Sequence, residues 1–248
     1  MPVAIISDIH GNLIALDAVL DDIAARQIQQ IICLGDVAAT GPQPREVIAR
    51  LKQIACPVVM GNTDDWLLEP KLKEHTDPER QRIQEIEFWA FEQLSSEDRT
   101  YLAGFQPTIL YKLENSQHLL AYHGSPRSYS EHISPTTLDS DLDAALSGHQ
   151  ADIFIGGHSH MQMFRRHRRS LVLNPGSVGL AFNHTWPFDK TTRNPPWAEY
   201  AIIDTLNGGL NIELHRVPFD VQTFIQITLA SGMPHARWSA GEWVSSNF

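Results

Sequence analysis

The amino-acid sequence predicts an α/β fold, because apolar runs typical of β-strands alternate with segments of helical periodicity. Over the first part of the chain the order is strand, helix, strand, helix, strand, at residues 3–6, 13–23, 31–34, 44–54 and 57–60. Such an alternation favours parallel strands joined by right-handed crossovers. A second observation supports the prediction: polar side chains of the metal-ligating type follow five separate apolar runs, where α/β sheets usually carry their sites.

The first two helices are predicted from their apolar faces and their first residues. Apolar residues from Leu13 to Ile23 recur at helical spacing after Asn12, whose side chain suits a helix N-cap. Pro44 is suited to open the second helix, because its fixed φ angle fits the first helical turn.

Residues 63–105 have a different character, with no strand pattern, and we expect a helical insert there. One helix is predicted over 78–94, and Ser95 with Asp98 resembles a loose capping pattern that starts another. The insert directly follows a candidate metal ligand, so it is placed to cap the site and select substrates by size.

The second half of the chain predicts a hairpin, a short helix, further strands and a C-terminal helix. The expected elements are strands at 108–113 and 118–122, a helix at 138–146, strands at 153–155, 171–173, 199–204 and 211–217, and a helix at 219–229. No linker divides the sequence, so we expect a single domain over residues 1–248.

Composition narrows the possible functions. A net charge of −10 argues against a nucleic-acid platform that works by bulk electrostatics. No apolar run approaches membrane-spanning length. The sequence runs straight into its first strand and has two cysteines, so we expect no signal peptide, no disulfide framework and a cytoplasmic protein.

Seven side chains of metal-ligating type occur in local settings that a two-metal site requires. They are Asp8, His10, Asp36, Asn62, His123, His158 and His160. Each cluster follows an apolar run, and a chance origin for five such clusters is far less plausible than for one exposed Asp-x-His pair. We expect the ligands to meet at the carboxyl ends of the strands.

Two divalent cations about 3.5–4 Å apart need a shared anionic ligand, since their repulsion otherwise expels one of them. Asp36 is the expected bridge, because it stands between the two ligand groups in the order of the motifs. Two groups of ligands complete the predicted centre: Asp8, His10 and His160 for one metal, and Asn62, His123 and His158 for the other.

Nitrogen and oxygen ligands without thiolate suit manganese, iron, zinc or nickel better than calcium or magnesium. Manganese is our first expectation. The predicted reaction is hydrolysis of a phosphate ester by a hydroxide that bridges the metals. Asn62 is also expected to touch a substrate oxygen.

These motifs resemble the calcineurin-like metallophosphoesterase superfamily. The segments that carry the resemblance are DIHGN, GDV, GN-x-D, HG, GHSH and NPGSVG, from Val3 to about Asp204. The similarity is greatest to the small bacterial and archaeal phosphoesterases related to diadenosine tetraphosphatase. It implies a four-layer αββα sandwich, with two β-sheets flanked by helices, and supports the ligand set above. It also favours nucleotide or dinucleotide substrates over phosphoproteins, and leaves phosphodiester and phosphomonoester substrates open.

The sequence departs from the family pattern at Thr63, where many members carry a histidine that protonates the leaving group. Threonine is no acid at neutral pH. The enzyme then acts on esters with good leaving groups, or another residue supplies the proton, with Asp64 and His184 as candidates. Asp64 has an alternative role in holding its loop.

Absence of that histidine also leaves a second function open. The retromer scaffold subunit of the same superfamily lacks it and works by binding partners. The two hypotheses for this chain are therefore a phosphoesterase with a small soluble phosphate-ester substrate, and a metal-binding scaffold without catalysis. A large exposed apolar patch away from the metals would favour the scaffold. The sequence does not indicate an oligomeric state.

Three further segments have competing interpretations. Residues 174–179 lack the lysine of a phosphate-binding loop and are expected to form a turn that supports the site. Residues 181–196 form either one wall of the substrate cleft or a surface loop. The basic run 165–169 fits a solvated hairpin turn better than a nucleic-acid patch. Trp238 and Trp243 are expected to pack on the body of the protein or on a second subunit.

Overall fold

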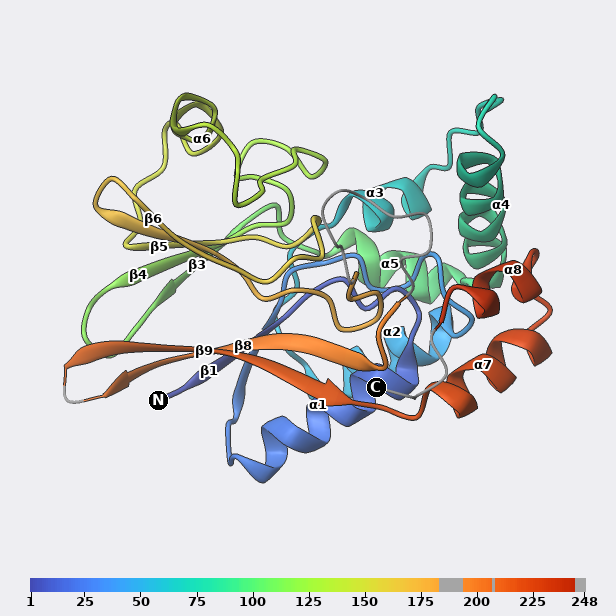
Figure 1. Cartoon of the computed structure of the whole chain (residues 1–248), viewed down its shortest axis with the longest axis horizontal. Coiled ribbons are helices and arrows are strands. Elements are labelled where there is room, and N and C mark those ends of the chain that lie inside the picture. The colour runs from blue at the N-terminus through green and yellow to red at the C-terminus, as the bar shows by residue number, and fades with distance from the viewer. Residues whose placement is uncertain (183–193, 207, 244–248) are drawn as a thin grey trace.

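A computed structural model describes residues 1–182, 194–206 and 208–243, whose strands form two mixed sheets (Figure 1). The four-stranded sheet has the order β2 (Gln30–Cys33), β1 (Val3–Ile6), β8 (Trp197–Leu206) and β9 (Gly209–Pro218). The five-stranded sheet has the order β3 (Ile109–Lys112), β4 (His118–Ala121), β5 (Ile153–Ile155), β7 (Ser170–Asn174) and β6 (Met163–His167).

Each sheet contains parallel pairs, and these place the loops that carry the predicted ligands. Strand β1 pairs in parallel with β2, with Ile5 opposite Ile32, and β4 pairs in parallel with β5, with Leu120 opposite Phe154. Antiparallel strands complete the sheets: β8 joins β1, and β3 joins β4. The carboxyl ends of β1, β2, β4 and β5 therefore meet at one end of the molecule.

The helices divide into the two outer layers and a separate group. Their bounds are α1 (Leu13–Ala25), α2 (Pro44–Ile54), α3 (Asn62–Leu68), α4 (Pro78–Gln93), α5 (Ser96–Ala103), α6 (Asp139–Ala145), α7 (Val221–Ala230) and α8 (Ala236–Gly241). Asn12 caps α1 as expected, because its side-chain oxygen accepts a hydrogen bond of 3.0 Å from the Ala15 amide. In Figure 1, α1 and α6 lie on opposite sides of the pair of sheets.

Burial along the strands shows the four layers directly. In β1, Ile5 packs with Ile155 and Ile203 between the sheets, while Ile6 joins the core formed with α1 and α2. In β5, Phe154 faces the other way and packs with Leu142 of α6. Alternate side chains of these strands therefore pack into two different cores. The predicted αββα sandwich is confirmed.

The insert is helical as predicted, and two of its helices have nearly the expected bounds. Helix α4 ends at Gln93, and Ser95 and Asp98 form a capping box at the start of α5. Helix α3 begins at Asn62 and was not separately expected. In Figure 1 the insert stands beside α7 and α8 at the end of the sandwich opposite to the N-terminus.

One expected strand is reduced to isolated bridges. Residues 57–60 pair only through Cys33 with Val58 and Val59 with Gln106. Pro57 has no N–H to donate to a ladder, and the chain turns into α3 two residues after Met60. The expectation of a full strand here was therefore wrong, although the extended path that delivers Asn62 is retained.

Two other expectations are settled by the fold. Residues 165–167 are the end of β6, and Arg168 and Arg169 form the turn of the β6–β7 hairpin. Arg165 pairs with Asp139 and Arg168 with Asp143, so this basic run contacts α6. Among the described residues, no helix has both the length and the apolar character needed to cross a membrane.

Candidate metal centre

The predicted ligands come from the ends of strands in both sheets. Asp8 and His10 follow β1 and Asp36 follows β2, whereas His123 follows β4 and His158 and His160 follow β5. Asn62 is the first residue of α3. The candidate site consequently lies where the two sheets end together.

The structure brings the charged ligands together in two groups. Within each group the ligand atoms lie within 4.8 Å of one another; the groups are Asp8, His10 and His160, and Asp36, His123 and His158. In the first, His160 Nε2 lies 3.2 Å from Asp8 Oδ1. In the second, His123 Nε2 lies 3.3 Å from Asp36 Oδ2. This division is the one expected from the sequence.

Asp36 reaches both groups. The oxygen that lies near His123 is also 3.8 Å from Nε2 of His10 in the other group. The Asn62 side chain belongs to the second group, since its Oδ1 lies 3.0 Å from His123 Nε2. A bridging role for Asp36 therefore has the required position.

Three imidazole rings are oriented from behind by backbone carbonyls. The Nδ1 atoms of His10, His123 and His160 lie 3.2, 2.7 and 2.8 Å from the carbonyl oxygens of Ala39, Leu34 and Leu180. A proton on Nδ1 leaves Nε2 with its lone pair directed into the site, as metal-bound histidines require.

The donor set fits a metal cation by its chemistry. Nε2 of His10 and Nε2 of His160 lie 3.1 Å apart, and Oδ1 of Asp8 lies 3.2 Å from Nε2 of His160. Two imidazole nitrogens and a carboxylate oxygen that converge in a buried space are ligands of the kind that a divalent metal takes, so the residues present suit a metal.

The carboxylates are buried, and among the described residues neither has a lysine or arginine partner. Asp8 is 0% exposed and Asp36 is 2% exposed. Burial raises the pKa of Asp8, but the opposite charges of His160 and His123 lower it further, so the net pKa lies below its ordinary value. For Asp36 the same balance with His123 and His10 holds the pKa far below the usual range. Both groups remain anionic at neutral pH.

The pKa values of two histidines in the cluster shift in opposite directions. Burial lowers the pKa of His123, but Asp36 and Asp8 outweigh it and raise that pKa to about 10. Burial and the neighbouring His160 lower the pKa of His10 to about 4. Without a cation the cluster therefore keeps a proton on His123, and a metal must displace it.

Backbone strain is concentrated at the ligands. Five of the eleven non-glycine residues with positive φ in the described chain are predicted ligands. Their φ angles are 55° for Asp8, 47° for His10, 53° for Asp36, 64° for His158 and 54° for His160. Left-handed backbone is costly for such residues and persists where the surroundings enforce it, as at functional sites.

Backbone contacts with the 174–179 turn enforce part of this conformation. The Ser177 hydroxyl donates a hydrogen bond of 2.7 Å to the Asp8 carbonyl, and the Gly179 amide donates to the same oxygen at 2.9 Å. The Ser7 hydroxyl donates to the Asp8 carboxylate at 2.5 Å. The prediction that this turn supports the site is confirmed.

Asp64 has a supporting role and does not face a substrate. Its buried carboxylate accepts hydrogen bonds from the amides of Asp36, Val37 and Gly61, at 2.7, 2.9 and 3.1 Å. Burial and the charge of Asp36 raise its pKa to about 7, yet both oxygens point at backbone and the residue is 0% exposed. This corrects the expectation that Asp64 donates a proton and supports its alternative role in holding the loop.

Residue 63, where many family members carry a histidine, is buried in this protein, and the second candidate acid lies outside the described residues. Thr63 is buried, its amide donates to Asp36 Oδ1 at 2.9 Å, and its hydroxyl has no hydrogen-bond partner. His184 lies outside the described residues.

A carboxylate that the sequence did not single out faces this region from α4. Burial, followed by the charge of Asp36, raises the pKa of Glu87 to about 7. Glu87 and Trp66 line a groove between α3 and α4. No spacing relation connects an acidic residue of the insert with strand-end ligands, so the sequence carried no signal for it.

Comparison with known proteins identifies the family. A family model for the calcineurin-like phosphoesterase superfamily domain matches residues 1–207. The chain belongs to this superfamily. Protein MJ0912 of Methanocaldococcus jannaschii is 27% identical over 239 residues, which cover 94% of this chain and 93% of that protein.

Solved structures share the fold over nearly the whole chain. A metallophosphoesterase from Sphaerobacter thermophilus is similar with a TM-score of 0.76 and 23% identity, covering 98% of this chain and 99% of that one. Protein PH1004 from Pyrococcus horikoshii has a TM-score of 0.78 and 21% identity, with coverage of 97% and 96%. Vps29 from Chaetomium thermophilum is less similar, with a TM-score of 0.52, 14% identity and coverage of 88% and 96%.

Metal binding is expected to release a proton and to strengthen as pH rises. Because the pKa of metal-free His123 is about 10, this ring is protonated at neutral pH and must lose its proton to bind a cation. We expect affinity for Mn²⁺ to rise about tenfold per pH unit between pH 6 and 8, measured by calorimetry in buffers of different ionisation enthalpy. His149→Asn, at an exposed histidine outside the cluster, should behave as wild type. Affinity independent of pH would contradict the assignment.

Glu87→Gln is expected to stabilise the metal-free protein at alkaline but not at acid pH. The folded-state pKa of about 7 lies above the ordinary value of 4.5, so folding favours the protonated acid. The stability that this group contributes is present below pH 4.5 and is lost as pH rises through 7. Chemical denaturation at pH 8 should show a gain of up to about 3 kcal/mol, absent near pH 4.5. Glu92→Gln, at an exposed site on α4, is the control, and an equal gain there would contradict this account.

Proposed function

We propose that this chain is a two-metal phosphoesterase that hydrolyses a phosphomonoester or phosphodiester. The observation that carries the proposal is the pair of carboxylate–imidazole groups joined through Asp36, with the Nε2 atoms of His10 and His160 facing each other at 3.1 Å. Membership of the calcineurin-like phosphoesterase superfamily supports it.

The chain's own residues provide the frame for this chemistry. Asp36 lies near histidines of both groups, Asp8 Oδ1 lies 3.2 Å from Nε2 of His160, and Asn62 Oδ1 lies 3.0 Å from Nε2 of His123. When bound, two divalent cations would activate a water as nucleophile and neutralise charge on the phosphoryl oxygens. The donor set of nitrogen and oxygen suits manganese first, with iron, zinc and nickel as alternatives. Asn62, the first residue of α3, would contact a substrate oxygen; in support, its side-chain oxygen lies in the second ligand group, 3.0 Å from Nε2 of His123.

The closed environment of Thr63 limits the preferred leaving groups. Neither Thr63 nor the amide-bound Asp64 offers a proton to a departing alkoxide. Esters of acidic alcohols, whose oxygen leaves without protonation, are the substrates that such a site handles best. The cysteines Cys33 and Cys56 are both free, which is consistent with a reducing, cytoplasmic setting.

The scaffold hypothesis has no comparable support in the described residues. A docking surface would need a contiguous exposed apolar patch. The exposed side chains Leu110 and Phe164 belong to β3 and β6, which are the opposite edges of the five-stranded sheet. Leu214 is on β9 of the other sheet. The other exposed large apolar side chains among the described residues come from further elements: Met1, Leu72 of the insert, Leu138 at the start of α6, Phe182, and Leu229 of α7.

Hydrolysis of 4-nitrophenyl phosphate and bis(4-nitrophenyl) phosphate by the manganese-loaded protein tests the proposal. Asp36→Asn and His158→Ala should each lower kcat/KM by at least about a hundredfold, because each removes a ligand of the charge-stabilising centre. His149→Ala is the matched control at an exposed histidine. Metal content measured alongside separates lost binding from lost turnover, and a wild-type protein carrying two metals per chain without turnover of either ester would refute the activity.

A further inference from the structure

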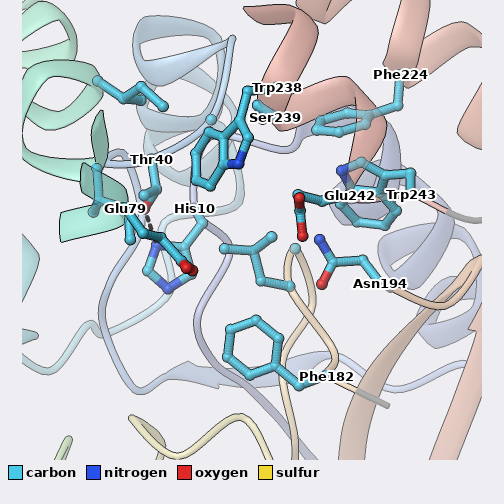
Figure 2. Close-up of a pocket in the computed structure, with 15 residues that line it drawn as sticks. His10, Thr40, Glu79, Phe182, Asn194, Phe224, Trp238, Ser239, Glu242 and Trp243 are labelled. Atoms are coloured by element: carbon cyan, nitrogen blue, oxygen red, sulfur yellow. Dashed lines mark hydrogen bonds between the residues drawn. The ribbon is translucent and has the colours of Figure 1, made fainter. Parts of the chain in front are cut away.

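A cavity of about 330 Å³ opens beside His10, between the insert and the C-terminal helices (Figure 2). Helix α4 contributes Glu79, Ile83 and Ile86 to one wall, and α8 contributes Trp238 and Ser239 to another. Since His10 also belongs to the first ligand group, a molecule in this cavity adjoins the metal centre.

Aromatic surface runs from the metal ligands into the cavity. The ring of Phe182 stacks on that of His160, with centroids 4.7 Å apart and an interplanar angle of 9°. Phe182 also lines the cavity, together with Phe224 and Trp243. In Figure 2, Trp238 faces the same space from the side opposite to Phe182. A flat ring is the group that such walls contact best.

The size of the cavity limits what it can accept. Small-molecule pockets measure about 300–1,000 Å³, so a volume of about 330 Å³ is at the lower end. It suits one ring system and not a second nucleotide. Leu180 and Ile83 add aliphatic contacts, and polar contacts are available from Ser239 and the amide of Asn194.

One aromatic wall is supported from behind by a cation. The guanidinium carbon of Arg82 lies 5.5 Å from the centroid of the Trp238 ring, an arrangement that stabilises the position of that ring.

We infer that the cavity beside His10 holds the organic part of the substrate, and that this part contains one flat ring. The inference rests on the proposed function for the ester, and on the Phe182, Trp238, Phe224 and Trp243 lining for the ring.

Binding of non-hydrolysable mimics tests the ring site independently of turnover. Phenylphosphonate should bind the manganese-loaded protein at least about tenfold more tightly than methylphosphonate, because the ring is buried against aromatic walls. Quenching of tryptophan fluorescence and inhibition of ester hydrolysis each give the dissociation constants of the two phosphonates. Trp238→Ala should reduce this preference severalfold and leave methylphosphonate binding unchanged, whereas Trp238→Phe should retain most of it. Phe182→Ala should also reduce the preference, and its methylphosphonate affinity measures any effect on the neighbouring His160.

The outcomes separate the two proposals. Equal binding of phenyl- and methylphosphonate, or a phenyl preference untouched by Trp238→Ala and Phe182→Ala, overturns the ring site even if esters are hydrolysed. Absence of hydrolysis in the metal-loaded protein rejects the phosphoesterase, and the phosphonate titrations then decide the ring site by themselves.

Discussion

Two buried carboxylates, Asp8 and Asp36, are the constraint around which the site is organised. Both are anionic, and no lysine or arginine among the described residues pairs with either. Their repulsion is tolerated only because imidazoles surround them and because a cation can replace the proton on His123. The remaining features of this end of the sandwich hold those two side chains against each other.

Close backbone approach is one of those features, and it accounts for two glycines of the motifs. A Cβ at Gly61 would overlap the carboxylate of Asp36, and a Cβ at Gly157 would overlap the Ser7 hydroxyl and the carboxylate of Asp8. Asp64 then stabilises the strained loop by accepting hydrogen bonds from three backbone amides. The buried carboxylate of Asp64 therefore fixes the loop that carries Asp36, whose own carboxylate is a candidate metal ligand.

The sequence was sufficient to predict the layers and which side chains cluster as candidate metal ligands, and insufficient to predict the cavity beside them. Residues such as Asp8 and His123 were predictable because each follows an apolar run that defines its strand and direction. Asp64 was ambiguous, since a carboxylate beside a turn can face solvent or bind its own backbone, and only the fold decides between them. Glu87 carried no signal, and for Trp238 the sequence left two packing alternatives open, because the surroundings of both residues depend on how the insert packs, which no local pattern encodes.

The difference between the predictable ligands and the unpredictable cavity residues has a physical basis in the fold. The ligands lie on strand ends that both cores hold rigid, so their positions depend on interactions shared by the whole sandwich. The cavity walls come from α4, α8 and the segment around Phe182, which pack on that end without entering the sheets. Residues of α4 and α8 can therefore change without moving the strand ends, whereas Phe182 and Thr40 contact the ligands His160 and His10 and connect the cavity to the cluster. His10 belongs to both the ligand cluster and the cavity lining, so the proposed ring site and the proposed metal centre adjoin at this residue.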